Sequence, residues 1–182
     1  MGGAFDWLSS LIETCSKLFP RIIHVLETHQ AVCFRRGKHS KLLPGIHWYW
    51  PVWSIVVSQP VKRQTINLWM QTLMTKDGET VIASETVVYE ISDVEKALVD
   101  TYDLIDTIND LAQVSVKEII QSMTLLEIQS EPGQVDKMLT RSVRSELHPF
   151  GIKVIRAFMD NLSTATVLRN VQEQASSQSP SK

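Results

Sequence analysis

Two cysteines and two histidines near the N-terminus are the first candidates for metal chemistry. Cys15, His24, His29 and Cys33 carry the thiolate and imidazole groups that zinc prefers. No pair has the Cys-x-x-Cys spacing of structural zinc sites, and two cysteines do not make a disulfide framework. Two buried thiols beside incidental histidines explain the pattern more simply. The sequence therefore predicts no metal site and no cofactor.

Serine residues that could act as nucleophiles have no supporting motif. Ser9, Ser84 and Ser115 lack a Gly-x-Ser-x-Gly context, and neither cysteine has a clear activating partner. The chain also lacks a phosphate-binding loop and a dinucleotide fingerprint. A hydrolase would need a site that the sequence does not reveal, and we expect no enzyme activity.

Acidic residues offer a second possible metal cluster. Asp103, Asp106 and Asp110 are separated by three and four residues, which places them on one side of a helix. Such a row more simply lines the solvated face of that helix. None of these carboxylates predicts a catalytic site.

Composition and charge narrow the classes of protein. The chain has 182 residues, of which 43% are hydrophobic and 21% are charged, as in an ordinary globular protein. The net charge is −2 and the isoelectric point is about 6.2. A chain with this charge balance gives no electrostatic reason to expect nucleic-acid binding.

Residues 42–61 form an aromatic segment without a single charged side chain. Its prolines argue against a membrane-spanning helix, although its length would suffice for one. Trp48 and Trp50 have the same parity on a strand and would point the same way, with Tyr49 opposite. Trp48, Trp50 and Trp53 either fill a core or face lipid at headgroup depth, where such rings settle. We consider all three as membrane-contact candidates.

The N-terminal segment, residues 1–21, has the pattern of an amphipathic helix that Pro20 ends. Such a helix is too short to cross a bilayer but can lie in its interface. The alternative is a helix packed on its own domain or on a neighbouring subunit. Interspersed polar residues argue against a cleavable signal peptide. The candidate membrane-contact residues here are Phe5, Trp7, Leu8, Leu11, Ile12, Leu18 and Phe19.

The next part, residues 22–91, has the pattern of an antiparallel sheet. Strands are predicted from Ile22 to Arg35, from Val61 to Leu73 and from Thr80 to Ile91. In the second of these, Ile66, Leu68 and Met70 fall on one face. Asp77-Gly78 predicts a hairpin with a type I′ turn. The buried face of the return strand is expected to carry Val81, Ala83, Val87, Tyr89 and Ile91.

Residues 92–162 are predicted to form a helix-rich α+β part. Ser92-Asp93 begins a short helix, 103–123 and 134–148 form longer helices, and 152–162 form a final strand. The last segment, 163–182, is a short tail of low complexity after about Ala175. The predicted fold class is α+β, with an amphipathic N-terminal segment before a β-rich subdomain and a helix-rich α+β subdomain.

A series of short motifs occurs in a recognisable order. They are Gln30-Ala31-Val32, Leu43-Pro44-Gly45-Ile46-His47, Met74-Thr75-Lys76-Asp77-Gly78, Tyr89-Glu90-Ile91-Ser92-Asp93, Thr124-Leu125-Leu126-Glu127-Ile128 and Phe150-Gly151-Ile152-Lys153-Val154. In this order and spacing the chain resembles the SPFH or Band 7 superfamily, which includes stomatins, prohibitins, flotillins and bacterial regulators of a membrane AAA protease. The resemblance covers residues 24–162. Glu127 and Asp160 match landmarks of this family, for which the resemblance implies helix capping or structural pairing.

This resemblance implies a non-catalytic scaffold that associates with membranes and oligomerises. It would place the aromatic segment near lipid and make the protein a peripheral or monotopic membrane protein. The implied partners are the lipid surface, further copies of the chain and a membrane protease, without nucleic acid. The alternative function is a protein-interaction module that regulates a membrane AAA protease without touching lipid.

Overall fold

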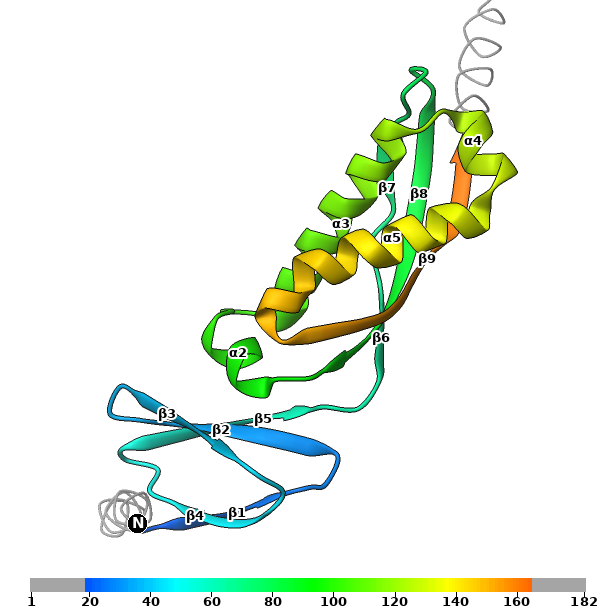
Figure 1. Ribbon diagram of the computed structural model, residues 1–182. Coiled ribbons are helices and arrows are strands. Elements are labelled where there is room, and N and C mark those ends of the chain that lie inside the picture. Colours follow the sequence, from blue (N-terminus) through cyan, green and yellow to red (C-terminus); the bar gives the residue numbers. More distant parts are fainter. Residues whose placement is uncertain (1–18, 165–182) are drawn as a thin grey trace, which may run out of the picture.

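The computed structural model describes residues 19–164, and its strands and helices follow the predicted α+β class (Figure 1). The strands are β1 (Arg21–Val25), β2 (His29–Arg35), β3 (Lys38–Leu42), β4 (Gly45–Tyr49), β5 (Ser54–Pro60), β6 (Gln64–Asn67), β7 (Gln71–Met74), β8 (Thr80–Ile91) and β9 (Ile152–Thr164). The helices are α2 (Val94–Val99), α3 (Leu104–Ser122), α4 (Leu125–Ser130) and α5 (Pro132–Leu147), and a 3-10 turn η1 (His148–Phe150) follows α5.

The first five strands form two small antiparallel sheets at one end of the molecule (Figure 1). β1 pairs with β4, while β2 lies between β3 and β5. Val25, Ala31 and Val32 are buried, and Val32 belongs to the main hydrophobic core. The single strand predicted from Ile22 to Arg35 is therefore wrong in one respect: the chain turns between β1 and β2, and the two strands join different sheets.

A type I′ turn connects β2 to β3. Arg35 pairs with Lys38, so the loop has two residues, and both Arg36 (φ 49°) and Gly37 (φ 77°) have positive φ. Two positive φ values define this turn and match the twist of the flanking strands. The hairpin reaches the second part of the molecule, where His39 lies 3.0 Å from Glu95 of α2.

The second part of the molecule is built around the long strand β8. β6 and β7 pair with opposite halves of one edge of β8, and β9 pairs along its other edge. α3 and α5 pack on one face of this sheet (Figure 1). The predicted face of β8 is confirmed, because Val81, Ala83, Val87, Tyr89 and Ile91 are all buried in the main core.

The strand predicted from Val61 to Leu73 is interrupted. β6 ends at Asn67 and β7 begins at Gln71, so the segment between them leaves the sheet. Leu68 is buried and donates its N–H to the carbonyl of Glu85 at 2.8 Å. Met70, predicted to share its face, is exposed. The break explains this error, because strand parity no longer applies across it.

The turn between β7 and β8 is not of type I′. Only Gly78 has positive φ (84°), and its N–H bonds to the carbonyl of Thr75 at 3.0 Å. Thr75 also donates its N–H to the carbonyl of Glu79 at 2.9 Å. This is the pattern of a type I turn followed by a left-handed residue, the common longer hairpin loop.

Side-chain caps begin three of the helices. Asp93 caps α2, as the sequence predicts, and Asp103, expected only to line the solvated face of the long helix, caps α3. The short helix α4 was not predicted; Thr124 and Glu127 form a capping box at its start. Pro132 occupies the first turn of α5, where its missing N–H costs nothing.

Helix α5 is joined to β9 through polar side chains spaced four residues apart. Asp136 accepts from the N–H of Met159 at 3.2 Å. Thr140 accepts from the N–H of Ala157 at 3.0 Å. Arg144 donates to the carbonyls of Val154 (3.0 Å) and Ile155 (3.3 Å). Residues at this spacing share one side of a helix, so α5 satisfies backbone groups along β9.

Candidate functional site

An exposed apolar face lies on the β1–β4 sheet. Ile22 pairs with Trp48 across this ladder, and His24 pairs with Ile46. The exposed fraction is 58% for Ile22, 68% for Ile46 and 70% for Trp48. Directly paired residues project from the same face of a sheet. We call Ile22, Ile46 and Trp48 the β1–β4 apolar surface.

Trp50 and Trp53 lie in the turn between β4 and β5. Trp50 is 45% exposed and Trp53 is 50% exposed. Trp48, Trp50 and Arg35 line a cavity of about 310 Å³ with Pro20. The guanidinium of Arg36 lies 4.4 Å from the centre of the Trp53 ring, a cation–π contact. None of the three tryptophans is fully buried, so filling the core does not account for them.

The remaining membrane-contact candidates lie mostly outside the described residues. Phe19 falls within them and is 68% exposed. Those outside are Phe5, Trp7, Leu8, Leu11, Ile12 and Leu18. Among residues 19–164, no helix combines the length and the apolarity needed to span a bilayer. Membrane contact of all ten candidates remains a prediction.

The part of the chain that carries the three tryptophans is locally basic. Residues 19–60 contain five Lys and Arg residues and one acidic residue, a formal charge of +4 in a chain whose net charge is −2. Lys38 and Lys41 are exposed on β3. The net charge of −2 for the whole chain conceals this local positive charge. Counting charged residues in each segment of the sequence reveals it.

A second exposed apolar pair was missed. Trp69 (78% exposed) and Met70 (70% exposed) lie in the break between β6 and β7. They line an open cavity together with Asp160 and Asn161 of β9. Nothing in the alternating pattern of 61–73 signalled that these side chains leave the sheet.

Glu85 is a buried carboxyl group that sequence reasoning also missed. It lies on β8 and is 1% exposed, and neither of its oxygens has a hydrogen-bond partner among the described residues. Burial raises the pKa of Glu85 to about 8, and the charges of Asp136 and Asp160 act in the same direction. The carboxyl is therefore mostly protonated at neutral pH.

The other acidic candidates have structural roles. Asp103 accepts hydrogen bonds from the N–H groups of Ile105 (2.9 Å) and Asp106 (3.2 Å). Glu127 belongs to the capping box of α4, and the hydroxyl of Thr86 donates to Asp160. Within residues 19–164, no three His, Cys, Asp or Glu side chains are arranged to hold a metal ion. Cys15, one of the four candidate zinc ligands, lies outside the described residues.

The architecture is that of an α+β domain in which one small sheet presents aromatic and basic side chains at its surface. The chain belongs to the SPFH domain / Band 7 family, whose model matches residues 23–179. This match covers the β1–β4 apolar surface except Ile22, the long strand β8 and the helices that pack on it.

Individual relatives agree with this assignment. An uncharacterized protein of Methanocaldococcus jannaschii is 25% identical over 92% of this chain and 85% of its own length. An uncharacterized protein of Archaeoglobus fulgidus is 27% identical over 91% of this chain and 67% of its own length. A stomatin homolog of Pyrococcus horikoshii is 27% identical over 71% of this chain. The match spans 49% of that stomatin homolog.

Proposed function

We propose that the protein is a non-catalytic, membrane-associated scaffold that binds lipid through the β1–β4 apolar surface and oligomerises. Membership of the SPFH domain / Band 7 family supports membrane association in general. The observation that carries the proposal for this chain is the exposure of Ile22, Ile46 and Trp48 on one face of a small sheet. Apolar side chains gathered at a surface mark a site of lipid or protein contact.

The proposed contact suits the boundary between lipid and water. Tryptophan rings settle at headgroup depth, while basic side chains near them are attracted to anionic lipids. Trp48, Trp50 and Trp53 supply the rings, and Arg36 and Lys38 are among the basic groups. Phe19 and the N-terminal candidates before it would extend the contact, since they immediately precede β1.

A vesicle flotation assay tests this proposal. The substitutions Ile46→Ser and Trp48→Ser remove two exposed side chains, so the protein should remain folded. Each apolar side chain moved out of water contributes about 2 kcal/mol. The double variant should therefore bind vesicles at least tenfold more weakly than the unchanged chain.

The matched control is Trp69→Ser, which removes an equally exposed tryptophan in the break between β6 and β7. It should float like the unchanged chain. Equal flotation of the Ile46→Ser/Trp48→Ser variant and the control would overturn the proposed lipid contact. Circular dichroism of all three proteins verifies that the fold is retained.

A protein could cover the β1–β4 apolar surface instead of lipid. In that case the chain would act as an interaction module, with a membrane protease as one possible partner class. Co-purification of a protease that is lost in the Ile46→Ser/Trp48→Ser variant, together with absence of flotation, would support this second function. Flotation of the purified chain alone would contradict it.

A further inference from the structure

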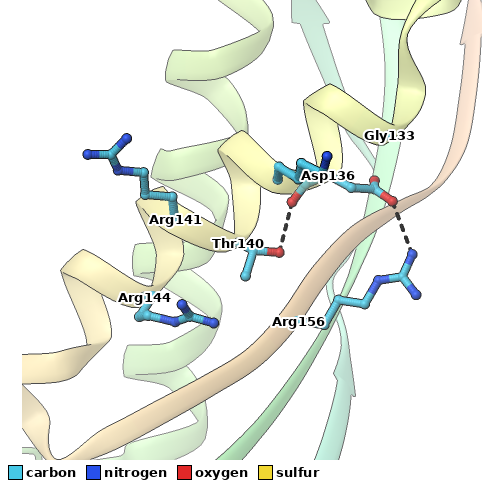
Figure 2. A pocket seen from close by; sticks show the side chains of 7 residues that line it. Gly133, Asp136, Thr140, Arg141, Arg144 and Arg156 are labelled. Atoms are coloured by element: carbon cyan, nitrogen blue, oxygen red, sulfur yellow. Dashed lines mark hydrogen bonds and ion pairs between the residues drawn. The ribbon is translucent and has the colours of Figure 1, made fainter.

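A basic groove runs between α5 and β9. Lys137, Arg141 and Arg144 of α5 and Arg156 of β9 line a cavity of about 770 Å³ together with Asp136. Figure 2 shows Asp136 and Arg144 of α5 on the side of the helix toward Arg156, while Arg141 projects away from them. Four positive side chains accompany one negative side chain, so an occupant should be anionic.

The four basic side chains differ in what they already contact. Arg156 lies 3.3 Å from Asp136 and stacks over the ring of Phe158 at 4.9 Å. Arg144 is bonded to backbone carbonyls of β9. Among the described residues, Lys137 and Arg141 form no ion pair. These two exposed cations are therefore available to a partner.

The chain carries a complementary acidic surface on α3. Asp106 and Asp110 lie on the helix, Asp103 caps its start and Asp100 lies just before it at the end of α2; all four are exposed, and no Lys or Arg occurs between Ala97 and Val116. Ile105 and Val114 are exposed on the same helix. Apolar side chains mixed with charged ones are typical of protein interfaces. None of the ion pairs within residues 19–164 joins this surface to the basic groove.

The terminal segments of the chain are poor candidates for the groove. Residues 1–18 contain Asp6, Glu13 and Lys17, and residues 165–182 contain Arg169, Glu173 and Lys182. Neither segment has a cluster of acidic residues. Lipid is also a poor candidate, because the β1–β4 apolar surface belongs to the other part of the molecule (Figure 1). A strongly acidic helix on a second copy fits the charge better.

We propose that the acidic surface of α3 in one copy of the chain binds the basic groove of α5 and β9 in another copy. This inference rests on the oligomerisation proposed above and assigns the surfaces that would carry it. The contact pairs Asp106 and Asp110 with Lys137 and Arg141. Electrostatic attraction of this kind weakens as ionic strength rises, so assembly should be salt-dependent.

Charge reversal of the full chain tests the contact by light scattering at low salt, without lipid. Lys137→Glu/Arg141→Glu should weaken self-association at least tenfold, and Asp106→Lys/Asp110→Lys should do the same. Neither variant touches Asp103, which caps α3, or Arg156, which pairs with Asp136. Lys62→Glu/Lys76→Glu makes the same charge change elsewhere and should assemble like the unchanged chain.

The charge-swapped chain carrying all four substitutions should regain self-association, and so should a mixture of the two double variants. Recovery cannot come from a damaged fold. The inference fails if the unchanged chain is monomeric, if either double variant assembles normally, or if the folded charge-swapped chain stays monomeric.

Vesicle flotation of the same proteins separates this inference from the proposed lipid contact. The charge-reversed variants should still bind vesicles through the β1–β4 apolar surface. If Lys137→Glu/Arg141→Glu lost vesicle binding but kept self-association, the groove would be a lipid site and the inference would be wrong. If flotation is lost only in Ile46→Ser/Trp48→Ser, lipid and the second copy bind different surfaces, as the inference requires.

Discussion

Thr140 of α5 binds both backbone groups of Ala157 in β9. Its hydroxyl accepts from the Ala157 N–H at 3.0 Å, and it lies 3.0 Å from the Ala157 carbonyl oxygen. The carbonyl of Asp136 is 2.8 Å from the same hydroxyl, so the single hydroxyl proton has two possible acceptors. One side chain thus holds the helix against the strand.

Replacing Thr140 by Val should destabilise the protein by about 1 to 3 kcal/mol. Valine has nearly the same shape but leaves the buried backbone groups of Ala157 without a partner. Chemical denaturation measures the loss. Thr107→Val is the control, because Thr107 donates only to the carbonyl of Asp103 in an exposed turn. Equal effects of the two substitutions would contradict a special role for Thr140.

Gly151 should not tolerate a side chain. Its φ is +71°, and a Cβ atom there would lie 2.5 Å from the carbonyl oxygen of Asp93. Its own carbonyl accepts the N–H groups of Ser92 (2.9 Å) and Asp93 (3.0 Å), so the segment is fixed. Gly151→Ala should lower the free energy of unfolding by more than 2 kcal/mol, since left-handed strain alone costs about 1 to 2.

Gly78→Ala provides the comparison for this substitution. Gly78 has a similar φ of +84°, but nothing lies within 4 Å of an added Cβ. The difference between the two variants in chemical denaturation isolates the contact with Asp93. If both lost the same stability, strain alone would be responsible.

The free energy of unfolding should fall as pH rises from about 4.5 to about 8, because Glu85 loses its proton more readily in the unfolded chain than in the folded one. The pKa of Glu85 is about 8 in the folded chain, against an ordinary value of 4.5 for a glutamate carboxyl. The folded state therefore binds the proton more tightly, and the contribution of Glu85 is complete below pH 4.5 and is lost as pH rises towards 8. The ceiling on this contribution is about 5 kcal/mol.

Glu85→Gln tests this pH dependence because it keeps the size of the side chain and removes its titration. Relative to the unchanged chain, the variant should become more stable by several kcal/mol between pH 5 and pH 8.5. Denaturation across that range measures the change. A constant difference between the two proteins would show that Glu85 does not titrate there.

Vesicle binding should depend on anionic lipid. Lys38→Gln/Lys41→Gln removes two exposed positive charges from β3, each worth about 1 kcal/mol near an anionic surface. Flotation with phosphatidylserine vesicles should weaken about tenfold or more, whereas binding to neutral vesicles should change little. Lys76→Gln/Lys117→Gln, in the second part of the molecule, is the control. Equal losses in both variants would contradict a local role for β3.

Local signals in the sequence were sufficient for α2, α3, α5 and β8, but not for the short helix α4. Asp93 and Asp103 mark helix starts because a carboxylate next to free N–H groups has few alternatives. The alternation in Thr80–Ile91 also places Glu85 on the buried face between Ala83 and Val87, although a charged residue is typical of the solvent-exposed face.

Features that depend on distant partners could not be predicted. The pairing of Ile22 with Trp48 requires β1 to leave the sheet that contains β2, and nothing near Ile22 specifies this. The exposure of Trp69 depends on a break whose cause lies in the pairing of β6 and β7 with opposite halves of β8. Strand pairings of this kind are determined by contacts between distant parts of the chain.

The polar side chains of α5 that bond to β9 also bear on the tendency of the protein to aggregate. An exposed strand edge invites strand addition by another chain and so promotes aggregation. Here Asp136, Thr140 and Arg144 occupy backbone groups of β9 between Val154 and Met159. The opposite edge of the sheet consists of the four-residue strands β6 and β7, separated by a break. Neither edge offers a long continuous template, so copies should meet through side chains and remain reversible.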